Sequence, residues 1–329
     1  MESDKRAELF QASALGMGMQ PMIVEKDFWV CFMLNHLFHE SEYRNAWAFK
    51  GGTSLSKSYH LIERFSEDID LILDWRKIAG AGENPWEERS RTKQDVFNKK
   101  TNKAAAEFFA NDLVPALNNE LGRDLGDGQW CSVDEQDSMV VNFYYPQIFE
   151  LSYLRSCVRL EIGPLAEWVP SHETEITPFA AERYPSLFEK RSTSVLTVDA
   201  ERTFWEKATI LHKIANFPES KQLPPRYARH LYDVYCMGNS DIKEKAFARK
   251  ELLKKDVAFK QKFYYAKSAH YETATLQDIT LLPPERMHAA LKADYASMRN
   301  MIYGKMPGFE ELLGYLAGLQ EEVHNLSCQ

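Results

Sequence analysis

The segment from Phe49 to Leu73, FKGGTSLSKSYHLIERFSEDIDLIL, constrains the fold more than any other part of the chain. An apolar run stops at Gly51 and Gly52, a hydroxyl-rich segment follows, and a second apolar run then carries Asp68 and Asp70. This order predicts a strand, a tight turn, a short helix and a second strand. Because side chains alternate along a strand, Asp68 and Asp70 are expected on one face, with their Cα atoms about 6.5–7 Å apart.

Two carboxylates on one strand face have two interpretations. They can form a solvated face that is neutralised by a nearby cation, such as Arg64 or a lysine, because like charges repel. They can instead bind two Mg²⁺ ions, or Mn²⁺ in their place, which hold the attacking and leaving oxygens of a phosphoryl transfer.

The adjacent glycines favour the metal interpretation. Backbone N–H groups at a helix start can bind phosphate, and Ser54, Ser56 and Lys57 add further donors. The alternative is an ordinary glycine turn with a Thr or Ser helix cap. The spacing is not that of a phosphate-binding P-loop. Ser54 and Lys57 match the SxxK of penicillin-recognising serine enzymes, but the chain lacks the SDN and KTG motifs that would complete such a site.

The composition is that of an ordinary globular protein. The chain has 329 residues, 44% of them hydrophobic and 27% charged, and a formal net charge of −8, which argues against coating nucleic acid by bulk charge. Its five cysteines are scattered and never form a CxxC pair, which fits reduced thiols in a cytoplasm. No run has the length of a signal peptide core or a membrane span, so a cytoplasmic protein without a membrane partner is expected.

The pattern of periodicity changes near Asp199. Before it, a helix is expected from Pro21, a second helix over 53–64, and a long polar helix that ends near Leu121. Strand-like runs follow at Gln129–Val133, Met139–Tyr145, Cys157–Ile162 and Ser192–Val198. After Asp199 nearly every segment has helical periodicity. We therefore expect an α+β domain with a mixed sheet and N-terminal helices over residues 1–198, and a helical domain over residues 199–329.

Two later residues carry chemistry in this pattern. Glu161 shares a strand face with Arg159, so it is either a third carboxylate of the metal site or the partner of that arginine. Lys207 lies on an amphipathic helix, where it is either solvated or placed to neutralise charge near a triphosphate.

The segment FKGGTSLSKSYHLIERFSEDIDL resembles the AbiEii/AbiGii-type nucleotidyltransferase toxins, a branch of the DNA polymerase β-like superfamily. The likeness extends to VEKDFWVCFML at 24–34, FWEKATILHK at 204–213 and RHLYDVY at 229–235. Family proteins are typically the toxin of a toxin–antitoxin or phage-defence pair. Those characterised resemble transferases that add nucleotides to RNA, including tRNA 3′ ends.

The resemblance implies a role for each matching residue. The phosphate-binding loop corresponds to Gly51, Gly52, Thr53 and Ser54, and the metal-binding pair to Asp68 and Asp70. Lys207 matches the motif lysine and Asp233 the later motif aspartate, and the superfamily's third carboxylate makes Glu161 a candidate. The implied partners are a nucleoside triphosphate, an RNA acceptor and a cognate antitoxin. His230 stands where many relatives have an acid, so this chain departs from the family's motif there, while Asp233 is intact.

Two other functions remain open. The same core could modify a protein or a small molecule, or it could be a nucleotide-binding or partner-binding module without catalysis. For an RNA acceptor, the sequence offers a basic, aromatic stretch over 243–265, for which the alternative is a solvated helix whose aromatic residues are core.

Overall fold

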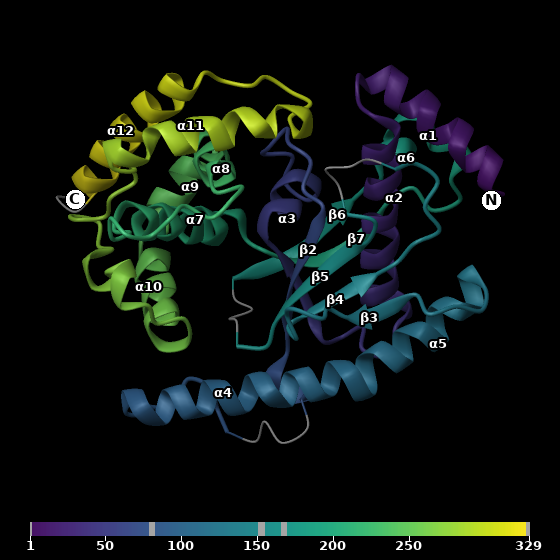
Figure 1. Cartoon of the computed structure of the whole chain (residues 1–329), viewed down its shortest axis with the longest axis horizontal. Helices are drawn as coiled ribbons and strands as arrows, with labels where there is room; N and C mark the ends of the chain where they lie inside the picture. Colours follow the sequence, from purple (N-terminus) through teal and green to yellow (C-terminus); the bar gives the residue numbers. More distant parts are fainter. Residues whose placement is uncertain (1, 79–82, 151–154, 166–169, 327–329) are drawn as a thin grey trace. The chain divides into compact units, whose positions relative to one another are not determined.

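A computed structural model describes residues 2–78, 83–150, 155–165 and 170–326. The chain divides into two compact units, which are described separately below. One consists of Met1–Ser58 and Phe65–Val198, and the other of Tyr59–Arg64 and Asp199–Gln329. We call them the sheet unit and the helical unit. Together they have an α+β composition, as expected from the sequence (Figure 1).

The sheet unit contains a mixed sheet of seven strands in the order β3-β4-β5-β2-β1-β7-β6. The strands are β1 (Trp47–Lys50), β2 (Asp68–Leu73), β3 (Cys131–Val133), β4 (Val140–Phe143), β5 (Val158–Gly163), β6 (Ser171–Ile176) and β7 (Thr193–Val198). Strand β2 pairs parallel with β5, and β1 pairs parallel with β7. The remaining pairs are antiparallel.

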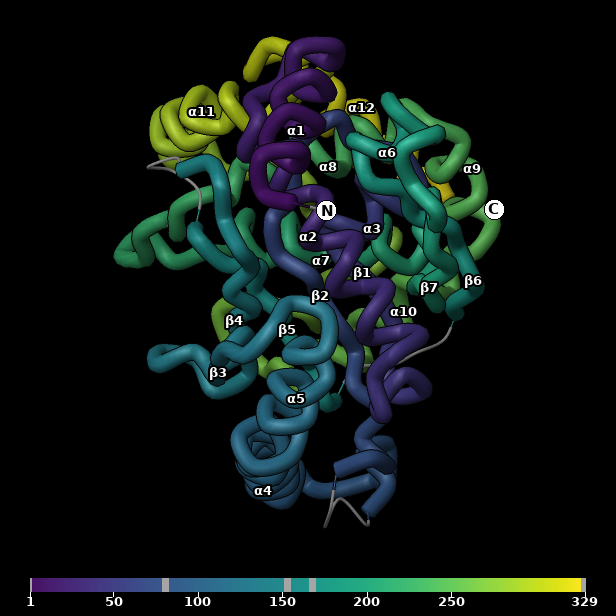
Figure 2. The backbone as a smooth tube through the Cα atoms, turned by 90° about the vertical axis from the view of Figure 1, so that its right-hand side faces the viewer, coloured from purple at the N-terminus to yellow at the C-terminus, as the bar shows by residue number. Residues whose placement is uncertain are grey.

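The helices of the sheet unit are α1 to α6. Their bounds are α1 (Ser3–Met17), α2 (Pro21–Asn35), α3 (Gly51–Lys57), α4 (Arg91–Phe108), α5 (Val114–Leu125) and α6 (Phe179–Arg183), and single π-helical turns follow α2 and α4 at His36–Glu40 and Phe109–Leu113. The second π turn joins α4 to α5 in one long helical run (Figure 1). In the side view of Figure 2, α2 and α5 both lie next to strands of the sheet.

The two faces of the sheet differ in polarity because strand side chains alternate. Ile69, Leu71 and Leu73 of β2 point into the main core, together with Trp29 of α2 and Leu117 of α5. The carboxylates of β2 occupy the opposite face. There Ile72 packs in a small apolar cluster with Ala48 and Val198.

Two details of the sheet unit differ from the sequence prediction. Helix α3 ends at Lys57 rather than near Arg64, and His60 then has a positive φ of 52°, which breaks the helical path. Strand β6 was not predicted, because its sequence SHETEI is polar and, at the edge of the sheet, only Ile176 is buried. A polar edge strand lacks the apolar run that identifies inner strands.

The helical unit contains α7 to α12. Their bounds are α7 (Ala200–Ala215), α8 (Ala228–Gly238), α9 (Ile242–Ala248), α10 (Glu251–Phe263), α11 (His288–Ser297) and α12 (Phe309–Asn325), with short 3₁₀ turns at Lys267–Ala269, Tyr271–Thr273, Glu285–Met287 and Met298–Met301. The basic stretch expected as one helix is two helices. They separate at Arg249, whose guanidinium bonds Asp199 at 2.7 Å.

Two general features bear on the expected environment. Cys31, Cys131, Cys157 and Cys236 are free, and Cys328 lies outside the described residues. Among the described helices, none combines the length and the apolarity needed to cross a bilayer.

Candidate active site

The acidic face of the sheet is formed by two parallel strands. The register of β2 and β5 places Asp68 beside Arg159 and Asp70 beside Glu161. Since residues two apart share a strand face, these four side chains lie on the same side of the sheet. Glu161 is the most exposed of the acidic groups, with 44% of its side chain accessible, whereas Asp68 retains 18%. The face is therefore half-buried and open to a ligand.

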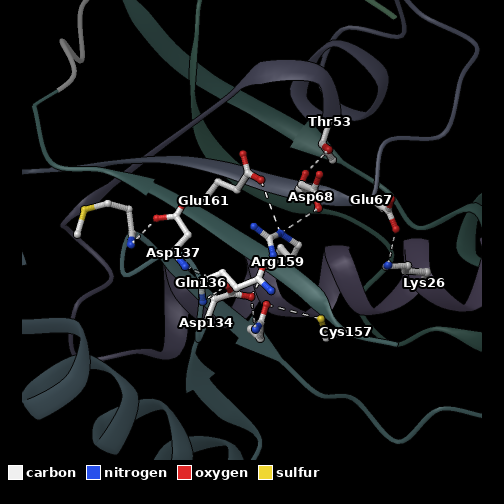
Figure 3. A network of polar contacts seen from close by, with 12 residues as sticks. Lys26, Thr53, Glu67, Asp68, Asp134, Gln136, Asp137, Cys157, Arg159 and Glu161 are labelled. Carbon is white, nitrogen blue, oxygen red and sulfur yellow. Dashed lines mark hydrogen bonds and ion pairs between the residues drawn. The ribbon is translucent and has the colours of Figure 1, made fainter. Parts of the chain in front are cut away.

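Arg159 supplies the counter-charge for this face (Figure 3). Its Nε lies 4.0 Å from Asp68 Oδ1 and 3.7 Å from Glu161 Oε1, and its Nη1 lies 3.1 Å from Asp134 Oδ2. A hydrogen bond from Asn142, together with a backbone N–H from Gln136, holds the pKa of Asp134 below its ordinary value. Asp134 thus remains ionised and anchors the guanidinium.

This arrangement corrects the expected counter-cation of the aspartates and bears on both interpretations of Glu161. The cation expected from Arg64 comes instead from Arg159, because the Arg64 guanidinium is buried in its ion pair with Asp233. Glu161 both pairs with Arg159 and lies next to Asp70 in register, so the two interpretations of Glu161 are compatible. Asp134 was not identified from the sequence, since it lies just outside a strand and its link to Arg159 spans 25 residues.

The glycine turn lies against the second aspartate. Gly51 is the first residue of α3 and has a φ of +82°. A Cβ atom at this position would lie 1.9 Å from Asp70 Oδ2, which is far inside van der Waals contact. Only glycine lets the backbone approach the carboxylate so closely.

The hydroxyls that follow the glycines are used locally. The Thr53 hydroxyl donates to the backbone carbonyl of Asp68, and the Ser54 hydroxyl donates to the carbonyl of Gly51 at 2.9 Å. Both side chains are buried. The Thr53 bond ties α3 to β2, and the Ser54 bond closes the first turn of α3. The groups that this turn can offer to a phosphate are its backbone N–H groups, which have no partner within a helix.

Lys57 has a different position from the one expected of a phosphate ligand. Its side chain is only 4% exposed, and its ammonium lies 2.8 Å from Asp27 Oδ1 and 3.9 Å from the centroid of the Phe179 ring. The Asp27 charge raises the pKa of Lys57 against the effect of burial. We therefore assign Lys57 to the packing of α3 rather than to the nucleotide.

The donor set of the acidic face fits a hard divalent cation. Carboxylate oxygens are the ligands that Mg²⁺ prefers, and Asp68, Asp70 and Glu161 present them on one accessible face. Among the described residues, the group whose ligand atoms lie within 4.8 Å of one another is a different one, formed by His36, Glu40 and Asp124.

That second group has a structural explanation. His36 Nε2 lies 2.9 Å from Glu120 Oε2, and His36 Nδ1 lies 3.4 Å from Glu40 Oε2. Both ring nitrogens already have carboxylate partners, so the cluster joins the end of α2 to α5. This cluster is therefore a structural contact, and the carboxylates that could hold a metal ion on the acidic face are those of Asp68 and Asp70.

The helical unit holds the other two motif residues together. Asp233 is fully buried and accepts from Arg64 Nε at 2.7 Å and Arg64 Nη2 at 2.9 Å, and its Oδ2 lies 2.9 Å from Lys207 Nζ. Burial alone would raise the pKa of Asp233, but the two cations hold it well below its ordinary value. Asp233 is thus an ionised carboxylate between two positive charges.

His230 completes this cluster as a neutral group. Its Nδ1 lies 3.4 Å from Lys207 Nζ, and burial together with the charges of Lys207 and Arg229 holds its pKa well below the ordinary value. A neutral ring that accepts from the ammonium carries its own proton on Nε2. Arg64, Lys207, Asp233 and His230 therefore have a combined charge of +1.

The basic stretch divides into a buried part and an exposed part. Phe259 and Phe263 are each 7% exposed, and the Phe247 ring stacks on Trp205, so these aromatic rings belong to the core. Tyr264 and Tyr265 remain 51% and 46% exposed. The exposed lysines of α10 are Lys254 and Lys255. The core interpretation therefore holds for the phenylalanines.

Comparison with known proteins gives three findings. The sequence profile of the family described as nucleotidyl transferase AbiEii toxin, type IV TA system, matches residues 33–315. No curated protein matches the chain. Among solved structures, MenT4, a nucleotidyltransferase toxin from Mycobacterium tuberculosis H37Rv, aligns over 98% of each chain with 15% identity and a TM-score of 0.46. That likeness is too remote to bear on the site or the substrate.

Proposed function

The chain belongs to the AbiEii family of nucleotidyltransferase toxins, and we propose that it transfers a nucleoside monophosphate from a nucleoside triphosphate to RNA, with Mg²⁺ bound at Asp68 and Asp70. Membership of this family assigns nucleotidyltransferase activity and a place in a type IV toxin–antitoxin system. The metal, the acceptor and the individual residue roles are the proposal. Its main support is the parallel register that sets Asp70 beside Glu161 on one accessible face.

The reaction has one bond formed and one broken. An acceptor hydroxyl oxygen attacks the α-phosphorus, the bond from that phosphorus to the bridging oxygen breaks, and pyrophosphate leaves with the electron pair. The hydroxyl proton passes to a carboxylate, for which Glu161 is the candidate. Mg²⁺ held by Asp68 and Asp70 would stabilise the negative charge that develops in this step.

The protein contributes mainly position and charge. In the proposed site Gly51, Gly52 and the backbone of Thr53 and Ser54 bind the phosphates, because the first turn of α3 presents N–H groups. Lys207 is assigned to the triphosphate by its match to the family's motif lysine, and the combined charge of +1 of its cluster within the helical unit has the sign that this role needs. Asp233 orients Lys207 through their ion pair.

An RNA acceptor is supported by the exposed part of the basic stretch. Lys254 and Lys255 offer charge for phosphates, and the exposed rings of Tyr264 and Tyr265 can stack on unpaired bases. We propose a tRNA or another structured RNA as acceptor, a cognate antitoxin as protein partner, and a cytoplasmic toxin that serves phage defence. Transfer to a protein or a small molecule is the alternative.

The test is incorporation of α-labelled nucleoside triphosphate. The purified protein is incubated with total RNA or with total protein, with Mg²⁺ or with a chelator. We expect label in RNA only, and none in Asp68→Asn or Asp70→Asn variants that keep the wild-type melting temperature. Label in protein instead of RNA would show that the acceptor is a protein. Undiminished labelling by both variants would refute the metal assignment.

A further inference from the structure

Three successive charged residues of α2 lie inside the sheet unit. Glu25, Lys26 and Asp27 are 0%, 1% and 2% exposed. Successive residues of a helix point in different directions, so each of these side chains reaches a different segment. Because burying a charge is costly, each needs a specific partner.

Lys26 holds the start of the strand that carries the aspartates. Its Nζ lies 2.8 Å from Glu67 Oε2 and 2.9 Å from the carbonyl of Arg155. Glu67 directly precedes Asp68, the first residue of β2, and Arg155 lies three residues before β5. Figure 3 shows the Lys26–Glu67 pair next to Asp68. One ammonium therefore joins the approaches to the two parallel strands that carry the acidic face.

Asp27 holds the far end of the helix that begins at the glycine turn. Its Oδ1 lies 2.8 Å from Lys57 Nζ, and its Oδ2 accepts from the backbone N–H of Phe179 at 2.7 Å. Lys57 is the last residue of α3, and Gly51 is the first. Asp27 thus fixes the orientation of a helix of seven residues whose other end touches Asp70.

Glu25 has partners of another kind. Its two carboxylate oxygens accept from the backbone N–H groups of Ile148 at 2.7 Å and Phe149 at 2.9 Å. This segment follows β4 and carries none of the candidate site residues. Glu25 is therefore as buried as its two neighbours and is ionisable like them, but it does not reach the site.

We propose that Lys26 and Asp27 are positioning residues for the transfer site, which hold β2 and α3 so that Asp68, Asp70 and Gly51 keep their geometry. This inference rests on the proposed function. A buried ion pair stabilises a fold no better than apolar side chains of similar size. The Lys26–Glu67 and Asp27–Lys57 pairs instead fix the relative position of the segments that they join, because each holds two atoms within hydrogen-bonding distance. A metal site needs its ligands held to about 0.5 Å.

The test measures Mn²⁺ binding by the electron paramagnetic resonance signal of the free ion. Binding that is lost in Asp70→Asn is assigned to the acidic face, which separates it from any binding at His36. Lys26→Met should weaken this binding about 10- to 100-fold, as expected when a residue that orients a metal ligand is removed. Glu25→Gln is the matched control, and it should lower the melting temperature without changing Mn²⁺ affinity.

The double variant Lys26→Met/Glu67→Met separates positioning from stability. Replacing both charges should restore the melting temperature and should leave Mn²⁺ affinity low. If Lys26→Met alone does not fold, the double variant is used for the Mn²⁺ measurement in its place. Recovery of affinity together with stability would overturn the inference, as would wild-type affinity in folded Lys26→Met. Failure of the wild-type protein to bind Mn²⁺ at the acidic face would instead refute the proposed function and the inference with it.

Discussion

Replacing Gly51 by alanine tests the contact between the glycine turn and the metal-binding face. Two effects are expected. The φ of +82° strains any residue that has a Cβ atom, at a cost of about 1–2 kcal/mol. The new Cβ would also lie 1.9 Å from Asp70 Oδ2 and 2.8 Å from Asp70 Cβ. Because one of these contacts is to the base of the side chain, rotating the carboxylate away is not enough, and Asp70 or the turn must move.

A second glycine of the same unit separates the two effects. Gly126 has a φ of +87°, and a Cβ atom there would meet nothing within 4 Å. Gly126→Ala therefore places a Cβ atom at a residue of positive φ without any overlap. Each variant should lose about 2–4 °C of melting temperature for each kcal/mol of strain. Gly51→Ala should lose more than Gly126→Ala.

Metal affinity gives the decisive comparison. Titration with Mn²⁺ should show a loss of at least about tenfold in Gly51→Ala, because Asp70 no longer presents its oxygen in place. Gly126→Ala should keep wild-type affinity. Equal melting temperatures and equal Mn²⁺ affinities in the two variants would refute the reasoning, because the overlap with Asp70 would then have no effect.

Three further predictions concern the helical unit. His230 is buried with a lowered pKa, so its ring takes up a proton when the protein unfolds at low pH. The free energy of unfolding should therefore fall below about pH 6.5, by up to about 1.4 kcal/mol per pH unit. Urea titrations at several pH values should show a weaker dependence of this free energy on pH in His230→Asn. Asp233→Asn removes the buried partner of two cations and should cost about 3–5 kcal/mol, against about 0–1 kcal/mol for Asp241→Asn in an exposed pair, and equal losses in urea titrations would contradict the assignment. Reversing Lys254 and Lys255 to Glu should weaken RNA binding and flatten its salt dependence at unchanged nucleotide affinity, whereas a wild-type salt slope would move the acceptor surface elsewhere.

The inner strands were predictable from the sequence because their signal is local. Alternation within Asp68–Leu73 gives both the strand and the shared face of its carboxylates, and the helices after Asp199 follow from their periodicity. Strand β6 was missed because an exposed edge strand has no apolar alternation to detect. The length of α3 was overestimated because the apolar residues after Lys57 keep helical spacing while the backbone at His60 does not.

Partners of charged residues were less predictable than strands. The alternation of β5 shows that Arg159 and Glu161 share a face, but the parallel register with β2 is a tertiary choice that no local pattern records. The burial of Lys26 was equally hidden, because its partner Glu67 lies 41 residues away. For the same reason the sequence placed Lys57 with the phosphate donors, although its ammonium points to Asp27.

The membership of Tyr59–Arg64 in the helical unit has a consequence for synthesis on the ribosome. Arg64 precedes Asp233, the carboxylate to which its guanidinium donates, by 169 residues in the chain. At a translation rate of about 5–20 residues per second, Asp233 is synthesised roughly 10–30 s after Arg64. The helical unit therefore cannot complete its buried charge cluster until α8 has been made. A gene fragment that starts at Asp199 would encode this unit without Arg64, so the two units are not separable by cutting the chain once.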